Sequence, residues 1–147
     1  MSRSLVFSIL LALFGCMNGP SHDEVARVRS PDGKVDAVLI ESNGGATTSF
    51  WYDVYLVSSG RKPSNDSVAY LYGAARNANA YGVNLKWQAA DTLVIEYLSA
   101  RDAKQTSSVV RRGEQDIQVV LRQGITDPKA PPGGMLYNQR GRPHDRS

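Results

Sequence analysis

The residues whose types and spacing point most clearly to a binding chemistry are Trp51, Asp53 and Tyr55. Alternate side chains of an extended strand point to the same face, so this pattern sets two flat rings and a hydrogen-bond acceptor side by side. Flat rings stack on sugar faces and a carboxylate accepts from hydroxyl groups, which predicts a glycan- or peptidoglycan-binding face. Aromatic residues are also enriched in strands for packing reasons alone. We favour this second interpretation, in which both faces of the strand are partly covered.

Asp53 and Glu96 are the carboxylates considered for catalysis, because each lies within a predicted strand. Two carboxylates about 5 Å or about 6.5–9.5 Å apart can hydrolyse a glycosidic bond. Nothing in the sequence brings these two together, and the predicted pairing makes Lys86 a diagonal neighbour of Glu96. We therefore expect an ion pair there and assign no catalytic residue.

The motifs of other common active sites are missing from the sequence. We expect the two histidines, His22 and His144, in the two flexible ends of the chain, so neither a Ser-His-Asp triad nor a zinc site is predicted. Lys34 lacks the upstream glycine of a phosphate loop, and Asp32 is not followed by the alternating carboxylates of a calcium loop. The sequence predicts no enzyme, no cofactor and no metal.

Cys16 has a predicted chemistry of its own. Arg3 precedes an apolar run from Leu5 to Gly15, and eleven residues of helix rise only about 16 Å, roughly half of a bilayer core. The run is too short to span a membrane well and has the form of a signal peptide. It ends in Leu13-Phe14-Gly15-Cys16, which resembles the bacterial lipobox, although Phe14 is bulkier than the usual residue.

The lipobox resemblance implies a location. In lipoproteins the cysteine thiol takes a diacylglycerol, the peptide is cut before it, and the new amine is acylated, for example with palmitate; several acyl chains make the attachment durable. Met17 stands where the Asp linked to inner-membrane retention would be, so in a Gram-negative host the resemblance implies the outer membrane, facing the periplasm. The alternative is an ordinary signal peptide with an accidental cysteine, but Asn18-Gly19-Pro20 provides no clear cleavage site for it.

Composition limits the fold and the partners. The 147 residues are enough for one domain, and 17 basic against 14 acidic residues give a formal charge of only +3. No nucleic-acid partner is predicted, because that requires a clustered basic stripe. Cys16 is the single cysteine, so the fold has no intramolecular disulfide. We expect a membrane contact through the lipid, and a binding or structural role toward an envelope protein or a glycan.

The chain divides into four predicted segments. Residues 1–15 form the signal peptide, 16–23 a lipidated tether, 24–124 a β domain, and 125–147 a tail containing proline, glycine and arginine. The tail has too few apolar residues to pack and is expected to be disordered. Contact between its basic side chains and anionic headgroups is the alternative.

The domain is predicted to be all-β. Candidate strands recur about every dozen residues with turn signals between them, which is typical of an antiparallel meander, a sandwich or a partly open barrel of about seven or eight strands. No stretch has a convincing helical period. After Tyr72 we expect a loop. The predicted strands are 24–29, 35–42, 50–58, 67–72, 83–89, 92–98, 105–111 and 116–123. In the strand 50–58, the set Phe50, Tyr52, Val54 and Leu56 is the expected core face.

Two hairpins are predicted. Ser30-Pro31-Asp32-Gly33 has the composition of a turn, with Gly33 at positive φ. The second hairpin runs from Val83 to Leu98, because only a loop at Ala89–Asp91 keeps one face apolar. Its expected pairs are Trp87 with Leu93, Leu85 with Ile95, and Val83 with Tyr97.

A family resemblance rests on Ser30-Pro31-Asp32-Gly33-Lys34, Ala37-Val38, Gly45-Ala46-Thr47-Thr48, Trp87 and Asp91 to Ile95. These elements resemble a group of small uncharacterised bacterial lipoproteins, over about 30–57 and 87–98. Many members have cysteine where Gly44 stands, which agrees with the lack of a disulfide here. The resemblance implies no activity. Ser-Pro-Asp-Gly hairpins also occur in β-propellers, but eight strands make only two blades.

Overall fold

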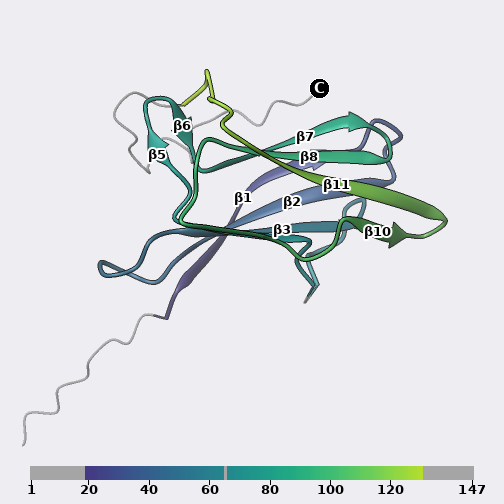
Figure 1. The fold of residues 1–147 in the computed structure, drawn as a ribbon. Helices are drawn as coiled ribbons and strands as arrows, with labels where there is room; N and C mark the ends of the chain where they lie inside the picture. The colour runs from purple at the N-terminus through teal and green to yellow at the C-terminus, as the bar shows by residue number, and fades with distance from the viewer. Residues whose placement is uncertain (1–18, 65, 131–147) are drawn as a thin grey trace, which may run out of the picture.

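The protein is a β-sandwich, seen in a computed structural model that describes residues 19–64 and 66–130. One sheet has the strand order β1-β2-β3-β4-β9, a second has the order β10-β11-β8-β7, and β5 pairs with β6 in a short hairpin. In Figure 1, β7, β8 and β11 lie above β1, β2 and β3, and β10 comes down to the level of β3; the fold confirms the all-β prediction. The strands are β1 (Ser21–Arg29), β2 (Val35–Asn43), β3 (Trp51–Ser58), β4 (Ala69–Tyr72), β5 (Arg76–Asn77), β6 (Ala80–Tyr81), β7 (Val83–Ala89), β8 (Thr92–Tyr97), β9 (Asp102–Gln105), β10 (Val109–Arg112) and β11 (Gln115–Gln123).

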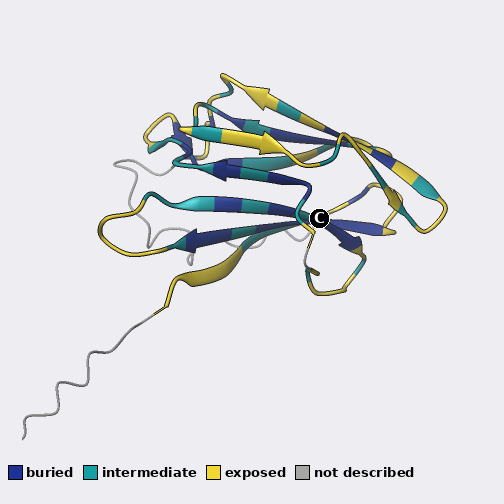
Figure 2. Ribbon diagram, turned by 60° about the horizontal axis from the view of Figure 1, so that its bottom comes forward, coloured by how far each residue is buried: buried dark blue, intermediate teal, exposed yellow. Residues whose placement is uncertain are grey.

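The hydrophobic core lies between the two sheets. Figure 2 shows buried stretches in the middles of strands and exposed turns. From the five-stranded sheet, Tyr52, Val54 and Leu56 of β3 point inward and are fully buried, as predicted, with Phe50 packed against them. From the other sheet, β8 contributes Leu93 and Ile95 to the same cluster. With no disulfide, this apolar burial is the main source of stability.

The first predicted turn is confirmed between β1 and β2. Gly33 has φ +74°, and its amide donates to the Ser30 carbonyl at 2.9 Å. The Ser30 hydroxyl donates to Asp32 Oδ1 at 2.6 Å, and this hydrogen bond holds the pKa of Asp32 below its usual value. The turn fixes the register in which β1 pairs with β2. β2 lies between β1 and β3 and is buried on both of its faces.

The second predicted hairpin has the expected register. Trp87 lies opposite Leu93, with a bulge between Trp87 and Ala89. β11 then pairs with the other edge of β8 in a parallel direction, which the antiparallel prediction did not include. This pairing sets Arg122 opposite Glu96, with Nη1 3.7 Å from Oε1. The ion pair that the structure shows for Glu96 is therefore with Arg122, and not with Lys86 as expected.

Side chains from one sheet close the sandwich against the other sheet. On one side, the indole N–H of Trp87 donates to the Val28 carbonyl of β1 at 2.9 Å. On the other side, Nε of Arg112 donates to the Leu56 carbonyl at 2.8 Å, beyond the point where β4 stops pairing with β3. Both contacts satisfy backbone carbonyls in β1 and β3 of the opposite sheet.

Three predicted boundaries are wrong. The strand 105–111 is two strands, because the chain leaves β9 for the second sheet: Thr106 still donates to Val68, whereas the Ser108 carbonyl accepts from Val119. The loop after Tyr72 contains the β5–β6 hairpin. The tether that was predicted to extend to Asp23 ends before that residue, because β1 already begins at Ser21 and pairs with β2 from there.

The two predicted ends of the chain are described only in part. Of the predicted tail, residues 125–130 are described, and the Asp127 amide donates to the Asn79 carbonyl at 2.7 Å with Asp127 buried. Cys16 and His144 lie outside the described residues.

A polar cluster closes one end of the core beneath the β5–β6 hairpin. The hydroxyl of Tyr52 donates to Glu41 Oε2 at 2.8 Å, and Nη1 of Arg76 lies 3.7 Å from Glu41 Oε1. The Arg76 guanidinium is stacked over the ring of Phe50 at 3.7 Å and that of Tyr81 at 4.6 Å. Burial and the Glu41 carboxylate raise the pKa of Tyr52, so its hydroxyl stays a donor. Arg76 Nη2 also donates to the Tyr81 hydroxyl, whereas Nη1 is buried without a hydrogen bond and faces Glu41 only as an ion-pair partner.

Candidate functional site

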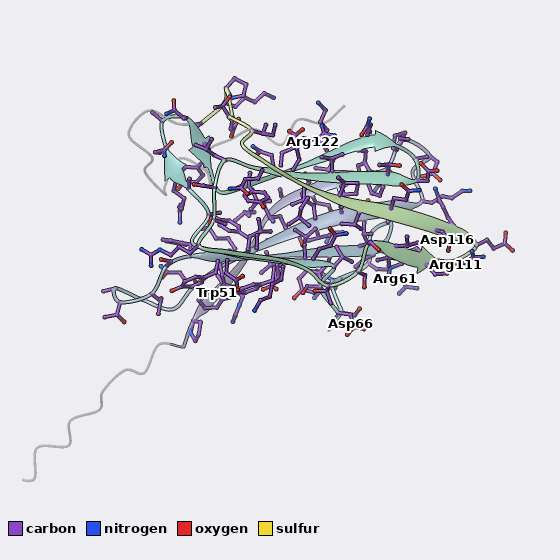
Figure 3. The ribbon with its side chains drawn as sticks, in the orientation of Figure 1. Trp51, Arg61, Asp66, Arg111, Asp116 and Arg122 are labelled. Carbon is purple, nitrogen blue, oxygen red and sulfur yellow. The ribbon has the colours of Figure 1, made fainter. Side chains whose placement is uncertain are left out.

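The structure brings Trp51, Asp53 and Tyr55 together on the outer face of the five-stranded sheet. They alternate along β3 with the buried residues Tyr52 and Val54, so their side chains point away from the core. All three are partly exposed. Figure 3 shows Trp51 on the lower side of the molecule, in the orientation in which β7 and β8 lie above.

The neighbouring strand β4 adds two more rings. Tyr72 is paired with Trp51 and Tyr70 with Asp53, so both tyrosines share the outer face, and both are partly exposed. We define the aromatic face as Trp51, Asp53, Tyr55, Tyr70 and Tyr72. The alternation of Tyr70 and Tyr72 in the predicted strand 67–72 could be read from the sequence. The pairing of that strand with β3 could not.

His22 also belongs to this region, which the sequence analysis missed. It was expected in a flexible tail, but it lies in β1 opposite Ser42, whose Oγ is 2.7 Å from His22 Nδ1. Its ring meets Trp51 edge to face, with centroids 6.1 Å apart. The expectation was wrong because β2 extends to Asn43 and provides pairing partners for residues 21–24.

Asp53 is the acceptor at the centre of the aromatic face. Burial raises the pKa of its carboxyl, opposed by a hydrogen bond from the Ser67 side chain and by the charge of His22. Burial also raises the pKa values of Tyr55 and Tyr70, and the Asp53 carboxylate adds to both shifts. The tyrosine hydroxyls therefore remain donors around a carboxylate that has lost part of its hydration.

The loop between β2 and β3 positions the Trp51 end of the face. The Ser49 amide donates to the Tyr72 hydroxyl oxygen at 3.2 Å, and hydrogen bonds with Ser49 lower the pKa of Tyr72. A Cβ at Gly44 would lie 2.8 Å from Thr48 Oγ1 and 3.4 Å from Cζ3 of Trp51. The absence of a side chain at Gly44 thus lets the loop approach the indole closely.

Several charged side chains near the aromatic face are paired with carboxylates. Asp36, fully buried on the same side of β2, accepts from Arg27 at 3.0 Å, from Arg29 at 3.1 Å and from the Gly60 amide at 2.8 Å. Burial opposes its ionisation, but these hydrogen bonds hold the pKa of Asp36 below its usual value.

The edges of this outer face have ion pairs as well. Arg27 forms a second ion pair with Glu24 at 2.7 Å. On β9, Lys104 pairs with Asp102 at 3.2 Å. These ion pairs offset much of the charge around the rings, and Arg101 lies beside Tyr72 and helps to lower its pKa.

The second carboxylate considered for catalysis is elsewhere. Glu96 alternates with the buried residues Ile95 and Tyr97 of β8, so it lies on the outer face of the four-stranded sheet. The core separates it from Asp53, and the two do not share a cleft. Within residues 19–64 and 66–130, no three His, Cys, Asp or Glu side chains gather to hold a metal ion. In the same part of the chain, no helix has the length and hydrophobicity needed to cross a membrane.

Comparisons with protein-family models, with curated protein sequences and with solved structures give no match for this chain.

Proposed function

We propose that this protein is a lipid-anchored binding module of the bacterial cell envelope whose aromatic face recognises a glycan. The observation that carries the proposal is the gathering of four partly exposed rings around Asp53 on one outer sheet face. Tyr52 is directed into the core and is closed to a ligand, whereas these four rings lie on the outer face and keep exposed area. The joint presence of the four rings and Asp53 on one accessible face is what supports the binding interpretation.

The chemistry of the face suits a sugar. The face of an aromatic ring is electron-rich and attracts the weakly positive C–H groups that cover one side of a pyranose. Asp53 can accept hydrogen bonds from hydroxyl groups, and the hydroxyl groups of Tyr55 and Tyr70 can donate to ring and glycosidic oxygens. Hydrogen bonds to a charged acceptor are the stronger ones, which gives Asp53 the main role in orienting the ligand.

The charge distribution disfavours other occupants. A nucleic acid or another polyanion requires a cluster of free cations, whereas Arg27, Arg29 and Lys104 near the face are held by carboxylates. Arg101 beside Tyr72 does not make a basic stripe. Docking of the face into a bilayer would remove the partly exposed Asp53 carboxylate from water, which is costly. A neutral, hydroxyl-rich ligand avoids both problems.

The predicted anchor supports an envelope location for this ligand. His22 contacts Trp51 and lies six residues after Cys16, a stretch of chain that spans at most about 20 Å. A protein lipidated at Cys16 would thus hold the Trp51 end of the face close to the membrane. Peptidoglycan is the glycan that we propose as the ligand.

Sedimentation with purified peptidoglycan tests the proposal, using the chain from Cys16 onward with Cys16→Ser. We expect this protein to pellet, Trp51→Ala to stay in the supernatant, and Trp51→Phe to keep part of the binding. Because Trp51 is only partly buried, Trp51→Ala should cost less than the about 3–5 kcal/mol of a fully buried tryptophan, so it should stay folded. A thermal melt checks this.

The control is Val109→Ala, which truncates a 55% exposed side chain on the other sheet and should pellet like the unsubstituted protein. Failure of the unsubstituted protein to pellet, or equal pelleting of folded Trp51→Ala, would refute the proposed function.

A further inference from the structure

We propose that the aromatic face binds an extended chain of several sugars lying along β3, and not a single sugar or a chain end. This inference rests on the proposed function and specifies the form of its ligand. It follows from the shape of the aromatic face, which the strand register determines.

The aromatic face is much longer than it is wide. Trp51 and Tyr55 are four residues apart in β3, and a rise of 3.4 Å per residue separates their Cα atoms by about 14 Å. Across the strands the rings occupy only the adjacent β3 and β4, about 5 Å apart. The contacts therefore form three successive rows: Trp51 with Tyr72, Asp53 with Tyr70, and Tyr55 alone.

A linear ligand matches this arrangement. One sugar ring is about as large as one tyrosine ring, so a single sugar on Trp51 cannot also reach Tyr55. Several linked sugars can stack at both ends of the face while a middle sugar donates hydroxyl groups to Asp53. Each row of side chains then adds its own part of the binding free energy. Affinity should therefore grow with the length of the sugar chain until the last row is occupied.

The position of the face on the sandwich also favours a chain that passes across it. The rings project from the outer surface of a sheet, where side chains stand roughly perpendicular to the strands. A depression of about 450 Å³ occurs elsewhere, between the β1–β2 turn and the β10–β11 turn, where Lys34 and Glu114 line it. The rings are not among the residues that line this depression; they stand on the sheet face itself, along which a polymer can pass.

Titration calorimetry with β-linked N-acetylglucosamine oligomers of one to six sugars tests the inference, using the chain from Cys16 onward with Cys16→Ser. We expect affinity to rise by about tenfold or more between the shortest oligomers and those of three or four sugars, and then to level off. Tyr55→Ala should remove the gain in affinity between the shortest oligomers and those of three or four sugars. Tyr55→Phe keeps the ring and should keep the gain; if Tyr55→Ala fails to fold, Tyr55→Leu replaces it.

The outcomes separate this inference from the proposed function. Equal affinity for one sugar and for six would overturn the inference and leave the proposed function standing. A gain with length that persists in folded Tyr55→Ala would also overturn it, as would pelleting with peptidoglycan when no oligomer binds. Absence of both oligomer binding and pelleting would refute the proposed function itself.

Discussion

The close approach of Gly82 to Tyr52 predicts a large difference between two glycines that have similar backbone angles. Gly82 has φ +78°, and a Cβ there would lie 2.4 Å from the hydroxyl oxygen and 2.5 Å from Cζ of Tyr52. Tyr52 is fully buried and hydrogen-bonded to Glu41, so its ring has no free space into which to move. Gly33 has φ +74°, but a Cβ there has no atom within 4 Å.

The expected costs follow from these two environments. Gly33→Ala should lose only the about 1–2 kcal/mol of a non-glycine residue in the left-handed region. Gly82→Ala adds the about 1–3 kcal/mol of overpacking, for a total of about 2–5 kcal/mol. In a domain with about 5–15 kcal/mol of stability, the second change removes a large share.

Urea denaturation of the two variants beside the unsubstituted protein measures both free energies of unfolding, with tyrosine and tryptophan fluorescence as the probe. Equal losses at the two positions would show that Tyr52 gives way without cost, and would refute the account of a rigid polar cluster at this end of the core. A lower free energy of unfolding in Gly33→Ala but not in Gly82→Ala would contradict this account more strongly.

Two further predictions concern the anchor and the buried aspartate. Cys16→Ser should abolish metabolic labelling with a fatty acid; label that persists in the variant, or never appears in the unsubstituted protein, would refute lipidation. Asp36→Asn should lose about 1.5–3 kcal/mol at pH 7, because Arg27 and Arg29 lose a charged acceptor. Since the folded-state pKa of Asp36 is lowered, its contribution is present above the unfolded value of about 3.9 and is lost as the pH falls toward the folded value. Unfolding free energies of the two proteins should therefore converge below about pH 4, and a difference that stays constant down to pH 2 would contradict the assignment.

Local patterns in the sequence predicted the features that depend on a few adjacent residues. The Ser30–Gly33 turn and the register of Trp87 opposite Leu93 follow from turn chemistry and from two-residue alternation, which act over short distances. The same alternation separated Trp51, Asp53 and Tyr55 from the core residue Tyr52.

Features that depend on distant pairing were missed. Tyr70 and Tyr72 join the aromatic face only because β4 pairs with β3, and His22 lies against Trp51 only because β2 is long enough to pair with residues 21–24. The crossing of the chain between sheets at Thr106–Ser108 and the parallel pairing of β8 with β11 are likewise set by the whole fold. Alternation within one segment carries no information on which strand will lie beside it.

Tryptophan emission during a titration with soluble peptidoglycan glycan strands tests the proposed role of the aromatic face most directly. The chain has two tryptophans, Trp51 on the face and Trp87 at the side of the sandwich, where its N–H is bonded to Val28. In Trp87→Phe the emission reports on Trp51 alone, and stacking on a sugar should shift it to the blue with a saturable dependence on ligand. In Trp51→Phe the remaining Trp87 emission should not change. An unchanged Trp51 emission, or a saturable change of equal size from Trp87, would contradict the account.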